Sequence, residues 1–292
     1  MILSWSLTIK MLIAREILKC LSWLLSPLRG RFTEQVVILM YHRVTGDVGL
    51  ELDVSTTDFD AQMNWLASTG RVISLDEAVR RVSTRDLCGC TWYVITFDDA
   101  YEDFYDCVLP LVLKHALPVT MYVPTGFLDD PSRPPISRSI RDASKLRPVT
   151  WLQLQEISTC TLVTIGSHTH SHREMTSLSD DEVLAEVQCC DESLALRLGV
   201  QVHHFAYPRG IWDERVEKIL QGRYETVALV GGGSLLTSAF DPQRLPRVPI
   251  LRSDGMRWFR ARITGRLGLE EQLTRWTKSL LSRFACLGSR SS

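Results

Sequence analysis

Two adjacent carboxylates, Asp98 and Asp99, follow an apolar run at residues 92–95 and a Thr-Phe dipeptide at 96–97. The run has the composition of a buried strand. An unpaired charge is costly to bury, so such a strand has little reason to end in two acids unless they bind a ligand or exchange a proton. The pair is therefore the first candidate for a chemical site.

A histidine cluster, containing His168 and His172, follows another apolar run at residues 162–165. In a helical turn, residues four apart share a face, so both imidazoles could bind one ion. If the strand instead continues, His170 shares that face and is a rival ligand. Two histidines and one carboxylate, from Asp98 or Asp99, suit a catalytic divalent metal with open positions. The other acid could then act as a general base on a water at that metal.

The chain has 292 residues, enough for one large or two small domains, and a formal net charge of −1. The charge is uneven: residues 1–31 hold five basic and one acidic residue, residues 252–292 hold nine and three, and residues 32–251 therefore carry −11. An acidic body between basic ends argues against nucleic acid as a partner. The eight cysteines lack paired C-x-x-C spacing, so we expect reduced thiols without a role.

The N-terminal segment contains two apolar runs of nine residues, 1–9 and 20–28, separated by charged residues. Neither run reaches the roughly 20 residues of a spanning helix, and no cleavage site of a secretory signal follows them. We expect an amphipathic helix near residues 10–25 and a cytoplasmic location. The basic ends either contact a membrane surface peripherally or pack on the body, and the sequence leaves both open.

Apolar runs and amphipathic segments alternate about seven times, which predicts a parallel sheet wrapped by helices. Chemically reactive residue types directly follow several of the runs. Barrel enzymes build their sites at the carboxyl ends of strands, so this regularity favours a closed barrel over an open sheet. The residues concerned are His42, Asp98, Asp99, His168, His172 and Arg209. The strands are expected at 36–41, 72–73, 92–97, 119–123, 162–165, 203–207, 226–230 and 247–250, and the main helices at 57–68, 76–82, 101–115, 151–157, 180–198 and 212–220.

Three segments resemble, in order, the motifs of the polysaccharide deacetylase (NodB-homology, carbohydrate esterase 4) family. They are 96–99 (Thr-Phe-Asp-Asp), 168–172 (His-Thr-His-Ser-His) and 205–210 (Phe-Ala-Tyr-Pro-Arg-Gly), and 40–44 (Met-Tyr-His-Arg-Val) resembles the opening motif of one branch. The resemblance covers roughly residues 36–250. It implies a distorted (β/α)7-type barrel, which we place over residues 32–251. The charge pattern adds an amphipathic extension at 1–31 and a basic helical extension at 252–292. The resemblance also implies metal-dependent hydrolysis of N- or O-acetyl groups on sugars.

The resemblance assigns roles to the matching residues. Asp98 is the expected general base, and Asp99, His168 and His172 are the expected ligands of zinc or a similar divalent ion. His170 falls at a variable position of the motif, which argues against it as a ligand. The oxyanion is expected to bind the metal and a backbone N–H of the third motif.

The third motif departs from the family pattern, with Ala206 in place of a frequent Arg and Arg209 in place of a Tyr. A backbone donor survives such substitutions, so Tyr207 and Arg209 remain the oxyanion and substrate candidates. Arg247 is the candidate to orient Asp98 in place of the missing Arg, and a surface position for it is the alternative.

No histidine follows His204, although the family uses a late histidine as the general acid. His42 is therefore the candidate acid, and another group or water is the alternative. The leading prediction is a metal-dependent deacetylase of an N-acetylated oligo- or polysaccharide. Two alternatives stay open: hydrolysis of another C–N bond in a small amide, and a degenerate barrel that binds a glycan without turnover.

Overall fold

The computed structural model describes residues 2–26, 34–136, 143–231, 233 and 240–273, the side chains of 2–12 and 143 excepted. The chain folds as two compact units. One comprises residues 33–256, and the other combines residues 1–32 with residues 257–292. Both terminal segments therefore belong to one unit.

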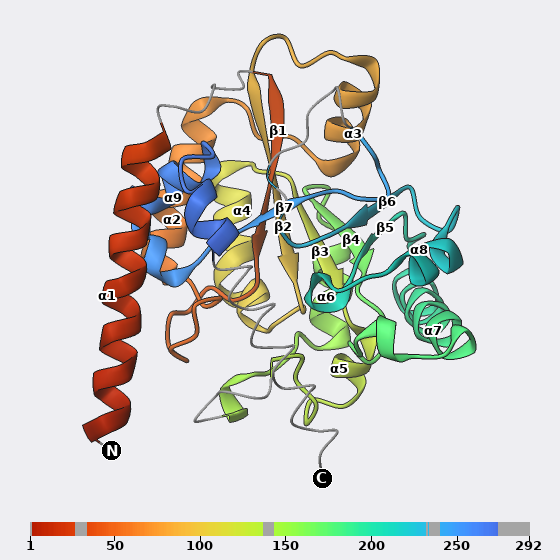
Figure 1. The fold of residues 1–292 in the computed structure, drawn as a ribbon. Coiled ribbons are helices and arrows are strands. Elements are labelled where there is room, and N and C mark those ends of the chain that lie inside the picture. The colour runs from red at the N-terminus through yellow and green to blue at the C-terminus, as the bar shows by residue number, and fades with distance from the viewer. Residues whose placement is uncertain (1, 27–33, 137–142, 232, 234–239, 274–292) are drawn as a thin grey trace. The chain divides into compact units, whose positions relative to one another are not determined.

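Seven parallel strands form the centre of the larger unit, in the order β6-β5-β4-β3-β2-β1-β7 (Figure 1). The segment before β7 pairs with the end of β6: Leu229 N donates to Leu245 O at 2.8 Å, and Gly231 N donates to Arg247 O at 2.8 Å. The sheet is thus a nearly closed barrel, which confirms the expected (β/α)7 class. The strands are β1 (Gln35–Tyr41), β2 (Thr91–Asp98), β3 (Val119–Val123), β4 (Val163–Ser167), β5 (His204–Ala206), β6 (Thr226–Ala228) and β7 (Arg247–Pro249). The predicted strand at 72–73 is only an isolated bridge between Val72 and Tyr93.

Helices cover the outside of the barrel, and their ends follow local capping rules. Ser179 and Thr150 begin α7 and α6 with complete capping boxes, as their spacing to Glu182 and Gln153 predicts. The helices of this unit are α2 (Thr56–Thr69), α3 (Leu75–Thr84), α4 (Leu109–His115), α5 (Thr125–Asp129), α6 (Trp151–Ser158), α7 (Asp180–Leu198) and α8 (Glu214–Leu220), with α9 (Gly255–Ile263) crossing into the second unit.

The helix predicted over residues 101–115 is divided. A π-helical turn, Phe104–Val108, precedes α4. Pro110 has no N–H to donate to the preceding turn, and a wide turn of this kind accommodates such a break in the hydrogen-bond ladder. The polar stretch 129–149 carries a 3-10 turn at Ala143–Lys145, and its residues 137–142 lie outside the described chain.

Side chains of β2 alternate between the barrel interior and the helical layer. Phe97 points to the helices, where its ring contacts those of Tyr41, Phe59 and Phe104 at centroid distances of 5.1–5.8 Å. Thr96 and Asp98 have the opposite direction, because successive residues of a strand face opposite sides. The apolar helical interface thus fixes which side chains of β2 enter the barrel.

The second unit is built on α1 (Ile2–Leu25), whose polar side chains bond to the C-terminal segment. Arg15 Nε lies 3.1 Å from Glu270 Oε1, and the indole N–H of Trp258 donates to Glu16 at 2.8 Å. Ser22 Oγ donates to the carbonyl of Arg266 at 3.2 Å. Among the helices described, none combines the length and apolar character needed to cross a membrane.

Candidate active site

The two carboxylates at the end of β2 point to different partners because the chain turns between them. Asp98 is the last residue of the strand, whereas Asp99 and Ala100 adopt left-handed conformations with φ of 75° and 51°. Non-glycine residues adopt this region at a cost of roughly 1–3 kcal/mol each, and such strain is concentrated at functional sites. The turn separates the two acids into two environments.

Arg247, at the start of β7, reaches Asp98 on β2 past the single strand β1 that lies between them. Its Nη1 and Nη2 bind the two carboxylate oxygens at 2.6 and 2.7 Å, and Nη1 also lies 3.3 Å from Thr96 Oγ1. Both side chains are buried. Burial alone would raise the pKa of Asp98, but the charge and hydrogen bonds of Arg247 outweigh it and hold that pKa well below its usual range. Asp98 is therefore an oriented, ionised carboxylate.

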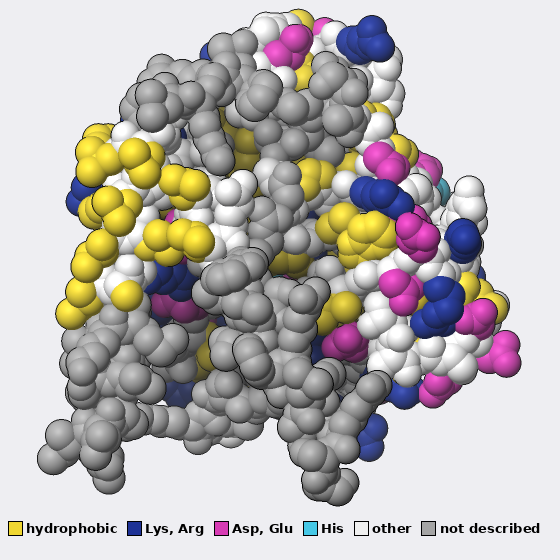
Figure 2. Space-filling view, in the orientation of Figure 1, with side chains coloured by type: hydrophobic (Ala, Val, Ile, Leu, Met, Phe, Trp, Pro, Cys, Tyr) yellow, Lys and Arg dark blue, Asp and Glu magenta, His cyan; other side chains and the backbone are white. Residues whose placement is uncertain are grey.

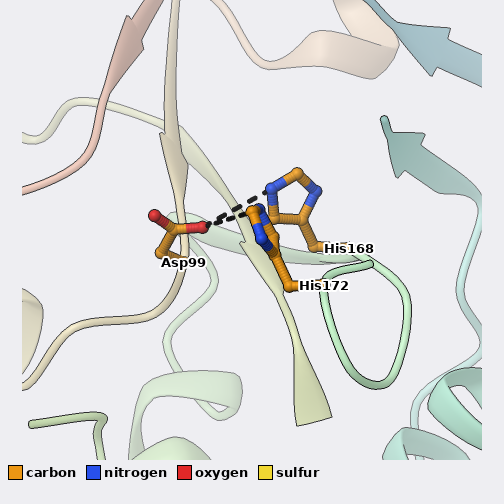
Figure 3. Close-up of side chains that lie close together, drawn as sticks. All are labelled: Asp99, His168 and His172. Carbon is orange, nitrogen blue, oxygen red and sulfur yellow. Dashed lines mark ion pairs between the residues drawn. The ribbon is translucent and has the colours of Figure 1, made fainter. Parts of the chain in front are cut away.

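Asp99 faces His168 and His172, which lie on the loop that follows β4 (Figure 3). Its Oδ1 lies 3.6 Å from Nε2 of His168 and 3.4 Å from Nε2 of His172. His168 is oriented by a hydrogen bond of 2.7 Å between its Nδ1 and the carbonyl of Ala206, which leaves Nε2 for the cluster. One ligand atom from each of the three residues lies within 4.8 Å of the others.

The chemistry of these three side chains fits a divalent metal. Asp99 Oδ1 is buried and has no hydrogen-bond partner within the described part of the chain. Burial, reinforced by the charge of Asp98, raises the pKa of Asp99 well above its usual range, so a cation is needed to keep this carboxylate ionised. Burial lowers the pKa of both histidines, which keeps the imidazoles in the neutral form that binds metals.

His42 directly follows β1 and lies close to Asp98. Its Nε2 is 4.0 Å from Asp98 Oδ2, and the same oxygen is 4.0 Å from Nε2 of His168. Burial lowers the pKa of His42 to about 4, although the charge of Asp98 opposes this shift. The structure thus brings His42, Asp98 and Arg247 together beside the three metal-binding candidates.

His170 points away from the cluster. Its Nδ1 lies 3.0 Å from Thr125 Oγ1, and its backbone N–H and carbonyl bond to Glu186 and Gly126. These contacts fix His170 against α5 and α7, and it is absent from the group of potential ligands. Thr169 has a local function instead, because its hydroxyl accepts the N–H of His172 at 3.1 Å.

Tyr207 is not placed to bind the oxyanion, contrary to the expectation for the third motif. Its N–H donates to Ala228 O at 3.2 Å, and its ring packs against Phe205 and Trp212 in the core beneath α7 and α8. Both groups are thereby committed to the fold. Arg209 is exposed and adopts φ of 58°. Its positive charge acts to lower the pKa of both Asp99 and His172. Of the two candidates, Arg209 is the one near the cluster.

Two groups that shape the site escape the sequence motifs. The carbonyl of Ala206 orients His168, and no side-chain pattern reports a backbone acceptor. Glu186 bonds to the loop carrying His172. The sequence does contain a signal for Glu186, which has the same helical spacing as the apolar residues of α7 such as Val183 and Val187. An unpaired acid on this buried side of the helix would be costly, so a partner is expected.

A model of one protein family matches residues 89–223, and its description is "Polysaccharide deacetylase". The matched segment contains the Asp98–Asp99 pair and the histidine loop.

Curated relatives point the same way. YxkH of Bacillus subtilis (strain 168), whose name assigns it to the polysaccharide deacetylases, is 26% identical over 62% of this chain and 59% of its own length. The poly-β-1,6-N-acetyl-D-glucosamine N-deacetylase of Escherichia coli (strain K12) is 23% identical over 58% of this chain and 29% of its own length. The chain thus matches less than two thirds of each of these relatives.

Solved structures share the barrel. The Streptococcus pyogenes deacetylase PplD, in complex with acetate, has a TM-score of 0.66 at 22% identity, over 79% of this chain and 99% of its own. IcaB from Ammonifex degensii has a TM-score of 0.65 at 20% identity, over 81% of this chain and 98% of its own. At such identities the likeness establishes the fold.

Proposed function

We propose that this chain, which a model of the polysaccharide deacetylase family matches over residues 89–223, is a metal-dependent hydrolase that removes acetyl groups from an N-acetylated saccharide. The observation that carries the proposal is the division of labour between the two acids. Asp98 is oriented and ionised by Arg247, while Asp99 lies with two neutral histidines in a cluster suited to a cation. A protein that only binds glycans would not need a separate, oriented carboxylate beside a metal site.

Asp99, His168 and His172 would hold the metal, with zinc as the ion we expect from two imidazoles and one carboxylate. Bound there, the ion would polarise the acetyl carbonyl and lower the pKa of the attacking water. Asp98 removes a proton from that water while the oxygen of the water forms a bond to the acetyl carbon. The backbone at Arg209 supplies the candidate N–H for the oxyanion.

The C–N bond then breaks, and the leaving nitrogen must gain a proton. His42 is the residue that we propose for this step, since its Nε2 is 4.0 Å from the Asp98 oxygen that accepts the proton. Because burial keeps the resting imidazole neutral, His42 transfers a proton that it has just received rather than one that it stores. The products are acetate and a free amine on the sugar.

A polymer of N-acetylglucosamine is the substrate class that we propose. The support is the relative from Escherichia coli, whose name gives poly-β-1,6-N-acetyl-D-glucosamine as its substrate.

The test is acetate release from N-acetylglucosamine oligomers, measured before and after chelation and after return of zinc. We expect release to stop with the chelator and to resume with the metal. Bound metal without release from any N-acetylated sugar would contradict the enzyme and favour a glycan-binding protein. Release from small amides but not from sugars would favour the other C–N hydrolase.

We also propose that the unit containing α1 contacts an anionic membrane surface. One side of α1 forms side-chain hydrogen bonds within this unit, through Arg15, Glu16, Lys19 and Ser22. The opposite side of α1 presents large apolar side chains to solvent (Figure 2). Those side chains are Ile13, Ile17, Leu21, Leu24 and Leu25, each 50–62% exposed. A helix with one apolar exposed face matches an interfacial helix, and the basic character of both terminal segments favours anionic lipid over a neutral partner.

Sedimentation with phosphatidylcholine vesicles, with and without phosphatidylglycerol, tests this contact. We expect binding that requires the anionic lipid and is lost in the double variant Ile17→Ser, Leu21→Ser. Leu196→Ser is the matched control, because Leu196 is an 87% exposed leucine on α7 of the other unit. Unchanged binding in the double variant, or a wild-type dimer that this variant dissociates, would contradict the membrane contact.

A further inference from the structure

The loop that carries both histidines is held by an acid on a neighbouring helix. Glu186, on α7, is 9% exposed, and its Oε2 accepts the backbone N–H of Ser171 at 2.8 Å. Its other oxygen accepts the hydroxyl of Ser171. One carboxylate therefore satisfies two donors of the residue directly before His172.

The neighbouring peptide is fixed from two sides as well. The N–H of His170 donates to the carbonyl of Glu186 at 3.0 Å, and the carbonyl of His170 accepts the N–H of Gly126 at 2.7 Å. A Cβ on Gly126 would lie 2.6 Å from that carbonyl oxygen, so the close approach needs glycine. Residues 170 and 171 are thus clamped between α5 and α7.

The residues on either side of this clamp, Thr169 and His172, have energetically unfavourable backbone conformations. Thr169 and His172 adopt φ of 65° and 54°, in the left-handed region that β-branched residues in particular avoid. Such conformations persist only where surrounding contacts determine them. The hydrogen bond from His172 N to Thr169 Oγ1 is internal to the loop, whereas Glu186, Gly126 and Thr125 restrain residues 170 and 171 from outside it.

We infer that Glu186 is a positioning residue for His172: by holding Ser171 and His170 it keeps Nε2 of His172 3.4 Å from Asp99 Oδ1 and so sets the affinity and geometry of the metal site. The inference rests on the metal site of the proposed function. Outer partners of metal ligands typically contribute 10- to 100-fold to metal affinity, which gives the expected size of the effect.

The test measures zinc affinity by competition with a chromophoric chelator and the visible absorption of the cobalt-substituted protein. The variants are Glu186→Ala, Glu186→Gln and Ser171→Ala. Glu192→Gln is the matched control, because Glu192 is an exposed glutamate on the same helix. Cobalt absorption reports ligand geometry directly, so a merely structural role of Glu186 would leave it unchanged in the folded protein.

We expect Glu186→Ala to weaken zinc binding by about 10- to 100-fold and to alter the cobalt spectrum, while Glu192→Gln changes neither. Glu186→Gln keeps an oxygen acceptor for one donor, so its effect is smaller. If Glu186→Ala does not fold, Ser171→Ala decides, since it removes only one hydroxyl and is expected to shift the spectrum. Wild-type zinc affinity and spectrum in the folded variants would overturn the role of Glu186 alone, whereas a wild-type protein without zinc binding would overturn the metal site itself.

Discussion

Arg247 binds both carboxylate oxygens of Asp98, a residue 149 positions earlier in the chain, at 2.6 and 2.7 Å. The pair joins β7 to β2 inside the barrel, with both side chains almost completely buried. Because Asp98 is held by a fork of two N–H donors, its orientation is set before any substrate arrives.

Replacement of Arg247 by Gln should impair both folding and turnover. Removing one partner of a buried ion pair costs about 3–5 kcal/mol, and loss of the orientation of Asp98 should lower kcat by about 100-fold. Arg247→Lys should recover little, since an ammonium cannot replace the fork. Urea unfolding and acetate release measure the two effects.

Arg244→Gln is the matched control for this prediction. Arg244 also binds both carboxylate oxygens of a partner, Glu217, through Nε and Nη2 at 2.6 and 2.7 Å, but these side chains are 44% and 22% exposed. Exposed pairs contribute about 0–1 kcal/mol, so this variant should retain stability and turnover. Equal effects of the two substitutions would show that Arg247 has no special relation to Asp98.

His42→Ala should lose most turnover while retaining the metal. The reason is that His42 lies 4.0 Å from Asp98 and outside the cluster of Asp99, His168 and His172. Metal content and the rate of acetate release are the two measurements. A wild-type rate would exclude His42 from proton transfer and assign it a structural role.

The metal-free protein should become less stable as the pH falls from about 6.5 toward about 4. Burial lowers the pKa of His42 to about 4, whereas the unfolded chain has the ordinary histidine pKa of about 6.5. In this window the unfolded chain binds a proton that the folded protein does not, so the free energy of unfolding rises with pH by up to about 3 kcal/mol.

Comparison of wild type with His42→Gln isolates this contribution. Asp103 acts in the opposite direction, because burial raises its pKa to about 6, but it is present in both proteins. Urea unfolding at about pH 7, 6 and 5 should give a shallower pH dependence for His42→Gln. Identical slopes would refute the shift assigned to His42.

Arg209→Gly should turn over substrate at nearly the wild-type rate if residue 209 acts through its backbone. Glycine keeps the N–H and adopts the φ of 58° without strain. Arg209→Val should instead be destabilised by about 1–2 kcal/mol, because a branched side chain is disfavoured in this region. If Arg209→Gly lowered the rate of acetate release as much as Asp98→Asn does, the guanidinium of Arg209, and not its backbone, would be the functional group.

The barrel and the meeting of the acids with the histidines were predictable from sequence. Apolar runs ended at Asp98 and near His168, and parallel strands of one barrel place their carboxyl ends on one rim. Local capping at Ser179 and Thr150 was predictable for the same reason, since the residues involved are three positions apart.

Contacts between distant segments were not predictable in the same way. The hydrogen bond that commits Tyr207 to Ala228 is formed between β5 and β6, and no residue type reveals an occupied backbone N–H. The π-helical turn before Pro110 divides a segment that the sequence pattern presented as one helix over residues 101–115. Arg247 was a candidate only through the absence of the motif Arg at position 206.

The most direct test of the account measures bound metal and acetate release together in Asp98→Asn and Asp99→Asn. The two substitutions are chemically identical and adjacent in sequence, so they separate the two functions that the structure assigns. We predict that Asp98→Asn keeps its metal and loses turnover, whereas Asp99→Asn loses both. Wild-type turnover in Asp98→Asn, or full metal content in Asp99→Asn, would contradict the division of the pair into a base and a ligand.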